Sequence, residues 1–317
     1  MATAAVPERS PFQSPGAPRL DPAKFKDPLF TAKGEPRAAV SLQQLKTLWF
    51  NTGTFCNLTC KSCYIESSPT NDALVYLTLE EVEAYLEQAL ELGVGEIGFT
   101  GGEPFMNRDI VPMITAALDH GFEVLVLSNA MRPMRRFEDV LRPLAIRRLT
   151  IRVSLDHYTK NVHEQERGAG SWAKAIDGLR WLCANGFRVA VAGRQLPDED
   201  PAAAREGYAR LFAELGVGIS GGLVLFPEMD EMADVPEISE RCWDLLGVSP
   251  ASPMCASSRM VVKAKGNDQP HVVACTLLPY DPQFALGATL AEAKGAVPLN
   301  HPHCARFCVL GGANCSG

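Results

Sequence analysis

From residue 45 onward, short apolar runs alternate with longer segments in which apolar residues recur every three or four positions. The short runs predict strands at 45–51, 96–100, 123–127, 149–155, 187–192 and 217–226. The longer segments predict helices at 78–92, 108–120, 134–144, 171–185 and 201–215. This alternation predicts an α/β fold with a parallel sheet and outer helices. Six units are too few for a closed eight-stranded barrel.

The two ends of the chain depart from this pattern. Residues 1–40 show neither period and are rich in proline, alanine and charge, so we expect an extended or disordered N-terminal lead. Residues 41–230 hold the strand–helix units. Residues 231–317 begin with a bridge that carries a short helix near 238–246. A β-hairpin then follows, with strands at 259–265 and 271–274.

Composition narrows the class of protein. The chain has 317 residues, 46% hydrophobic and 21% charged, with a formal net charge of −7. The acidic balance and the lack of a basic run disfavour a nucleic-acid partner. We see no apolar stretch of membrane-spanning length and no secretory signal, so we expect a cytoplasmic protein without membrane contact. Ten cysteines in a reducing compartment indicate metal binding or catalysis rather than disulfides.

Three cysteines stand directly after the first strand, at the spacing C-x3-C-x2-C: Cys56, Cys60 and Cys63. A compact loop can turn three thiolates inward from this spacing, and thiolates are the usual ligands of iron–sulfur clusters. Three ligands leave one iron of a four-iron cluster open for catalysis. A structural zinc site or a redox pair is the alternative, although a zinc ribbon would need a second C-x2-C pair.

Together with Gly101-Gly102-Glu103-Pro104 downstream, this motif resembles that of the radical S-adenosylmethionine (SAM) superfamily. The resemblance implies a partial (β/α)6 barrel in which the three cysteines hold a 4Fe–4S cluster. SAM chelates the open iron, and the reduced cluster cleaves SAM to methionine and a 5′-deoxyadenosyl radical. The family often has an aromatic residue where Ser62 stands here, and Tyr64 is the candidate to replace its contact with the adenine.

The same resemblance assigns a SAM site at the carboxyl ends of the strands, where parallel barrels place their active sites. It implies that Gly101, Gly102, Glu103 and Pro104 hold the amino group of SAM. Residues 154–172 resemble the corresponding segment of SPASM-type enzymes, which makes Ser154 and Arg167 candidates for the SAM carboxylate. The alternative for Arg167 is a surface ion pair with Glu164 or Glu166. Three further groups are weaker candidates: Ser128 and Asn129 for the ribose, Arg194 at the end of the fifth strand, and the glycine-rich residues 218–222 for a place under the adenine.

A second group of cysteines lies in the C-terminal part: Cys255, Cys275, Cys304, Cys308 and Cys315. The hairpin should bring Cys255 and Cys275 together, and four thiolates can close a cluster. The pattern resembles the SPASM and Twitch extensions, which hold auxiliary iron–sulfur clusters. Five cysteines favour the Twitch form, with one auxiliary 4Fe–4S cluster bound by the first four, unless Cys315 displaces one of them. A four-thiolate zinc site is the alternative.

These observations predict an enzyme that abstracts a hydrogen atom from its substrate, with an external electron donor such as flavodoxin or ferredoxin. The auxiliary cluster would accept an electron in an oxidation or bind substrate at an open iron. Residues 1–40 are too short for a peptide-recognition domain, which favours a small-molecule substrate over a peptide. The competing class is a non-catalytic iron–sulfur protein for electron transfer or redox sensing.

Overall fold

The computed structural model of the protein describes residues 21–196, 198–227 and 234–313. Its centre is a run of six parallel strands that neighbour one another in chain order, which confirms the predicted α/β fold. They are β2 (Thr47–Asn51), β3 (Glu96–Thr100), β4 (Glu123–Ser128), β5 (Leu149–Ser154), β6 (Arg188–Gln195) and β7 (Leu223–Pro227). The last strand is shorter than predicted, because Gly222 takes a positive φ of 88° that a strand does not allow.

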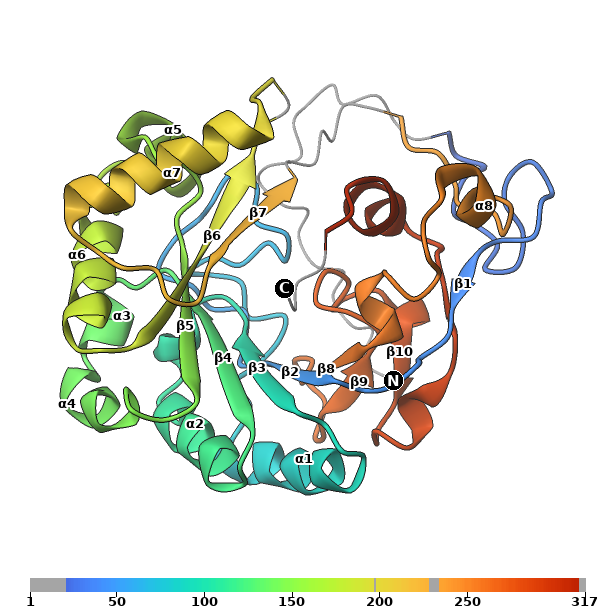
Figure 1. The fold of residues 1–317 in the computed structure, drawn as a ribbon. Helices are drawn as coiled ribbons and strands as arrows, with labels where there is room; N and C mark the ends of the chain where they lie inside the picture. The colour runs from blue at the N-terminus through green and yellow to red at the C-terminus, as the bar shows by residue number, and fades with distance from the viewer. Residues whose placement is uncertain (1–20, 197, 228–233, 314–317) are drawn as a thin grey trace.

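Helices follow the strands and lie on the outer side of the curved sheet (Figure 1). They are α1 (Leu79–Glu91), α2 (Ile110–Asp119), α3 (Arg132–Arg135), α4 (Glu138–Leu141), α5 (Lys160–Arg167), α6 (Ser171–Ala184) and α7 (Pro201–Leu215). The single helix predicted at 134–144 is wrong. The chain forms α3 and α4 there and tightens into a 3-10 turn (Arg142–Leu144), since Pro143 has no N–H for the α-helical ladder. Helix α5 was not predicted.

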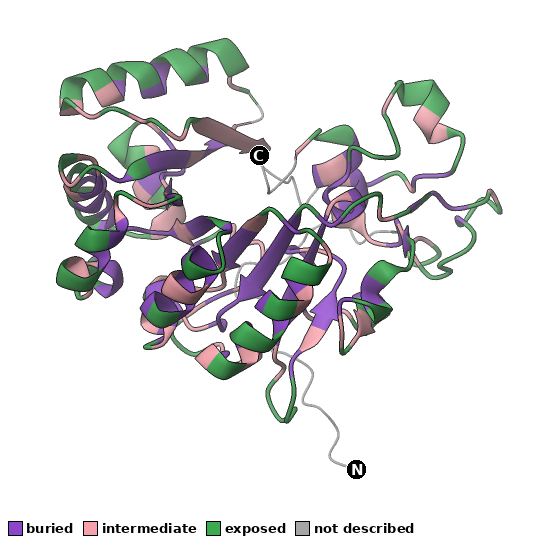
Figure 2. Cartoon of the chain, turned by 60° about the horizontal axis from the view of Figure 1, so that its bottom comes forward, coloured by how far each residue is buried: buried purple, intermediate pink, exposed green. Residues whose placement is uncertain are grey.

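The main hydrophobic core lies between the sheet and these helices. Its members include Phe50 and Phe99, whose rings stack at 5.6 Å from adjacent strands β2 and β3. Figure 2 shows the strands buried along most of their length, whereas the outer faces of the helices are exposed. Burial on both faces explains why these strands read as continuous apolar runs.

The C-terminal part continues the same sheet. Strand β8 (Ser258–Val262) pairs in parallel with β2, and β9 (His271–Val273) and β10 (Ala285–Gly287) add antiparallel strands, which makes nine in all. The predicted hairpin is therefore present as β8 and β9. Helix α8 (Cys242–Leu246) precedes it, and a π-helix, η6 (Cys304–Leu310), lies toward the open side of the arc (Figure 1).

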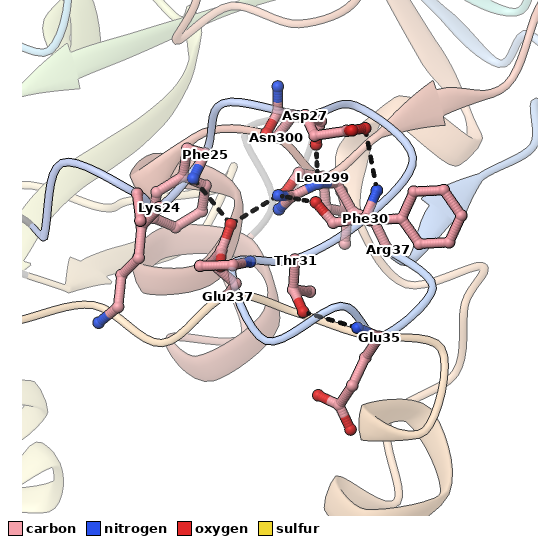
Figure 3. Close-up of polar contacts among 12 residues, drawn as sticks. Lys24, Phe25, Asp27, Phe30, Thr31, Glu35, Arg37, Glu237, Leu299 and Asn300 are labelled. Carbon is pink, nitrogen blue, oxygen red and sulfur yellow. Dashed lines mark hydrogen bonds and ion pairs between the residues drawn. The ribbon is translucent and has the colours of Figure 1, made fainter.

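The described part of the N-terminal lead contacts distant parts of the chain. Residues 1–20 lie outside the described part, but β1 (Ala39–Val40) pairs with β11 (Val297–Pro298) near the C-terminus. Just before β1, Arg37 is buried and donates to the carbonyl oxygens of Asp27 at 2.8 Å and Phe30 at 2.9 Å. Its guanidinium also pairs with the Glu237 carboxylate at 2.5 Å (Figure 3).

Glu237 completes this network from the bridge segment. Its carboxylate accepts from the backbone N–H groups of Phe25 at 2.7 Å and Ala32 at 2.6 Å. The Arg37 and Glu237 side chains are 0% and 5% exposed. Residues some 200 positions apart are thus joined by a desolvated ion pair whose remaining polar atoms have partners.

We predict that Arg37→Ala lowers the free energy of unfolding by about 3–5 kcal/mol, because the buried Glu237 carboxylate loses its counter-charge. Denaturant unfolding of the anaerobically purified protein, followed by circular dichroism, measures the change. Lys24→Ala is the matched control, since the Asp234 partner of Lys24 is 67% exposed. Equal losses in the two variants would contradict the role given to the buried pair.

Candidate active site

A cavity opens at the carboxyl ends of the parallel strands and encloses about 1110 Å³, open solvent included. We call it the cysteine-loop cavity, because the loop of residues 52–64 forms one of its walls. Many of the residues predicted for the SAM site line it: Cys56, Cys60, Cys63, Tyr64, Gly101, Gly102, Ser128, Asn129, Ser154 and Arg167. Strands β2 to β6 and the loops after them therefore deliver side chains to one place, as parallel topology requires.

The cysteine loop is seated on the turn that follows β3. The N–H of Gly102 donates to the carbonyl of Gly53 at 2.9 Å, and the N–H of Glu103 donates to that of Phe55 at 3.1 Å. A Cβ on Gly102 would lie 2.1 Å from the Phe55 oxygen, and one on Gly101 would lie 2.5 Å from the Gly53 oxygen. Only glycine permits this close approach of two backbones.

The thiols of Cys56 and Cys60 are buried, and that of Cys63 is half-buried. Burial raises the pKa of Cys56 to about 12 and raises the pKa of Cys60 as well. These thiols are therefore neutral by themselves at pH 7, and binding as thiolates requires the positive charge of a metal. Among the described residues, no three His, Cys, Asp or Glu side chains converge closely enough to hold a single metal ion. Three thiols from one loop at the edge of a cavity are a donor set that fits an iron–sulfur cluster.

Glu103 lies behind the glycines, and only 2% of it is exposed. Its carboxylate accepts from the Ser128 hydroxyl at 2.9 Å, the Asn129 N–H at 2.8 Å and the Phe105 N–H at 3.3 Å. Burial raises the pKa of Glu103 to about 7, although these donors act in the opposite direction. Pro104 is buried beside it, and neither Glu103 nor Pro104 lines the cavity. A carboxyl group with a pKa near 7 is thus fixed behind the glycines that line the cavity.

The Arg167 side chain is only 13% exposed and pairs with Asp156, so the predicted alternative of a surface ion pair with Glu164 or Glu166 is wrong. It binds both carboxylate oxygens of Asp156, with Nε at 2.7 Å and an Nη at 3.1 Å. Glu166 instead accepts a hydrogen bond from the Ser62 hydroxyl of the cysteine loop at 2.5 Å. Helix α5 therefore connects the end of β5 to the cysteine loop, a contact that its weakly apolar sequence did not reveal.

Arg194 makes a second contact with Asp156, at 3.4 Å, from the end of β6. It also donates to the Ser62 carbonyl at 2.7 Å, and its guanidinium lies 4.8 Å above the Tyr64 ring. Burial by itself would raise the pKa of Asp156, but the two arginines outweigh it and hold that pKa at about 2. Two cations around one carboxylate leave an excess positive charge at the cavity wall. The glycines at 218–222 precede β7 and do not line the cavity, so that expectation is wrong.

A second cavity of about 370 Å³ lies in the C-terminal part, and Cys255, Cys275, Cys304 and Cys308 all line it. The hairpin brings the first two together, one just before β8 and the other just after β9. The other two come from the π-helix η6. Burial raises the pKa of Cys255 to about 11. Cys315 lies outside the described residues. Four thiols around one apolar space also fit an iron–sulfur cluster.

The two cavities share a wall. Leu277 lines both of them, and Phe307, which lies between Cys304 and Cys308, lines the cysteine-loop cavity. The Phe307 ring meets the Tyr64 ring edge-on at 5.4 Å. Sequence reasoning missed Thr276, Leu277 and Phe307 as cavity residues, although each adjoins or closely follows a cysteine that it did single out. The C-terminal part thus helps to form the first cavity as well as the second.

Comparison with known proteins agrees with this geometry. Residues 50–206 match the family model for the radical SAM superfamily. The chain is 29% identical over 138 residues to the antilisterial bacteriocin subtilosin biosynthesis protein AlbA of Bacillus subtilis, covering 43% of this chain and 30% of AlbA. It is 26% identical over 133 residues to the GTP 3′,8-cyclase of Marinobacter nauticus, covering 42% and 40%. The chain therefore spans less than half the length of these curated relatives.

Among solved structures, Streptococcus suis SuiB bound to precursor peptide SuiA has a similar fold, with a TM-score of 0.60 at 13% identity, covering 80% of this chain and 66% of SuiB. SuiB bound to SAM gives a TM-score of 0.58 at 13% identity, covering 78% and 64%. Within the described residues, no helix is both long and apolar enough to span a bilayer. Residues 50–206 of the chain therefore form a domain of the radical SAM superfamily, whose cofactors are SAM and a 4Fe–4S cluster.

Proposed function

We propose that the protein is a radical SAM enzyme that cleaves SAM reductively and removes a hydrogen atom from its substrate. Residues 41–230 would form the catalytic barrel, and residues 231–317 the bridge and a Twitch-like unit. The observation that carries the proposal is that three loop thiols share one cavity with Arg167, Asp156 and Arg194. A protein for electron transfer alone has no need of such a polar pocket beside its cluster.

In this proposal Cys56, Cys60 and Cys63 hold the catalytic cluster. When bound there and reduced, the cluster supplies the electron that splits SAM into methionine and a 5′-deoxyadenosyl radical. The protein itself would hold the cluster and SAM in a fixed position relative to each other and limit the entry of water. The tight seating of the cysteine loop on Gly101 and Gly102 supports this role.

We propose the SAM contacts that the family resemblance implies, and the positions of several of the side chains support them. Glu103 and the backbone of 101–104 would accept hydrogen bonds from the amino group, and Ser128 and Asn129 would face the ribose. Ser154 and Arg167 would hold the carboxylate, supported by the excess of positive charge around Asp156. Tyr64 would contact the adenine, since its ring lies at the cavity wall.

We further propose that Cys255, Cys275, Cys304 and Cys308 bind one auxiliary 4Fe–4S cluster, with Cys315 as a possible substitute for one of them. A four-thiolate zinc site is the alternative, and the metal content of the reconstituted protein distinguishes the two. Four ligands leave no open iron, and Leu277 and Phe307 separate the two cavities. Both features favour an electron-accepting role, and hence a net oxidation, over substrate binding at the auxiliary cluster.

The substrate would enter the cysteine-loop cavity, and an external donor such as flavodoxin or ferredoxin would supply the electron. A small molecule is the first candidate, as for the GTP 3′,8-cyclase relative. A peptide is the second candidate. It is favoured by the similarity to AlbA, which is named for bacteriocin biosynthesis.

The test of the proposed activity compares wild type with a variant that combines Cys56→Ala, Cys60→Ala and Cys63→Ala. After anaerobic reconstitution, we expect about eight irons in wild type and about four in the variant. With dithionite and SAM, wild type alone should produce 5′-deoxyadenosine. Cys183→Ala, which changes a cysteine that lines neither cavity, is the control and should retain both properties. Equal 5′-deoxyadenosine from wild type and the triple variant would contradict the proposal.

The role of Glu103 predicts a pH dependence of SAM binding. Since its pKa is about 7, the carboxyl group is protonated below neutrality and accepts hydrogen bonds less well. Protonation of Glu103 should therefore increase the dissociation constant of SAM as the pH falls below 7. The increase from this group approaches about tenfold for each pH unit. The amino group of SAM titrates as well, so Glu103→Gln is the reference. We expect weaker binding and a shallower pH profile in that variant, measured by equilibrium dialysis between pH 6 and 8. Parallel profiles would refute the contact.

A further inference from the structure

The second cavity holds one polar side chain besides its cysteines. Its described lining otherwise consists of apolar residues, among them Met254, Leu278 and Phe284. The exception is His303, which directly precedes Cys304 at the start of the π-helix η6. In an apolar space a single N–H donor exerts a strong local field, because no water screens it.

The Nδ1 atom of His303 is sealed from solvent and has no hydrogen-bond partner in the described structure. The backbone N–H of His303 is used, since it donates to Nδ1 of His301 at 3.1 Å, and the two rings meet at 4.6 Å. A buried polar atom without a partner costs about 1–3 kcal/mol and calls for an explanation. An acceptor inside the cavity would supply the missing partner.

Arg259 is a cation near Cys255 and Cys275, and it cannot fill this role. It is completely buried, and its guanidinium donates to the backbone carbonyls of Ala293, Cys255, Ser258 and Gly295. It contributes charge from behind the backbone, whereas His303 lines the cavity itself.

We propose that Nδ1–H of His303 donates a hydrogen bond to a sulfur of the auxiliary cluster and thereby raises its reduction potential. The proposal rests on the auxiliary cluster assigned above. Reduction adds one negative charge to the cluster, and a fixed donor stabilises that charge more in the reduced state than in the oxidised state. His303 is thus a positioning and tuning residue that favours transfer of an electron from the first cavity to the second.

The test uses full-length protein in which Cys56, Cys60 and Cys63 are all replaced by alanine, so that only the auxiliary cluster remains. Its midpoint potential is measured by redox titration followed by electron paramagnetic resonance. His303→Leu should shift the potential to more negative values at unchanged iron content. His303→Gln, which retains an N–H donor, should restore part of the shift. His271→Gln, on β9 but outside the cavity lining, is the control and should not shift it.

An unshifted potential in His303→Leu with a full cluster would overturn the proposal. No iron in the triple-alanine parent would remove the auxiliary cluster itself, and this proposal with it. The catalytic assignment would then still stand on its own test.

A second measurement does not depend on whether the leucine variant binds iron. In the triple-alanine parent labelled with 15N-histidine, pulsed electron paramagnetic resonance of the reduced cluster should show one weak nitrogen coupling that is absent from His303→Gln. No coupling would overturn the hydrogen bond. A strong coupling, typical of a nitrogen bound to iron, would show that His303 is a ligand and would overturn its role as a donor.

Discussion

The backbone contact between the cysteine loop and the turn after β3 is the constraint on which the first site depends. The β2–β3 ladder continues past the strands, with Thr52, Gly102 and Glu103 donating in succession to carbonyls across the gap. The absence of a side chain at Gly102 allows this approach, because a Cβ there would overlap the Phe55 oxygen. The same turn buries Glu103 and orients it through Ser128 and Asn129. The contact between the cysteine loop and the turn after β3 therefore positions both the loop thiols and the Glu103 carboxyl group.

The second group of cysteines lies on the same sheet as the first. Because β8 pairs with β2, the strand that leads into the cysteine loop also carries the hairpin that bears Cys255 and Cys275. The π-helix η6 contributes Cys304 and Cys308 to the second cavity. It also places Phe307 against both Tyr64 and Phe226. The N-terminal segment secures this arrangement from the outside through Arg37 and Glu237. The separation of the two cavities is therefore set by a continuous sheet and an aromatic contact rather than by a flexible linker.

Much of this could be predicted from local patterns, and what could not depends on distant partners. The apolar runs located the six strands because buried parallel strands are apolar on both faces. The cysteine spacing and the glycines of the downstream motif singled out residues that line one cavity, although Cys56 and Gly101 are some 40 positions apart. Helix α5 was missed because Val162 is its only aliphatic residue, and one apolar position gives no helical period. The Arg37–Glu237 and Arg194–Asp156 pairs have no sequence signature at all, since each joins charges from separate elements.

Iron anomalous diffraction from crystals of the anaerobically reconstituted protein would test most directly the claim that the chain builds two cluster sites on one sheet. We expect two separate iron peaks, one beside Cys56, Cys60 and Cys63 and one among Cys255, Cys275, Cys304 and Cys308, with Leu277 and Phe307 between them. A single iron peak, or a zinc-edge signal at the second position, would contradict the claim.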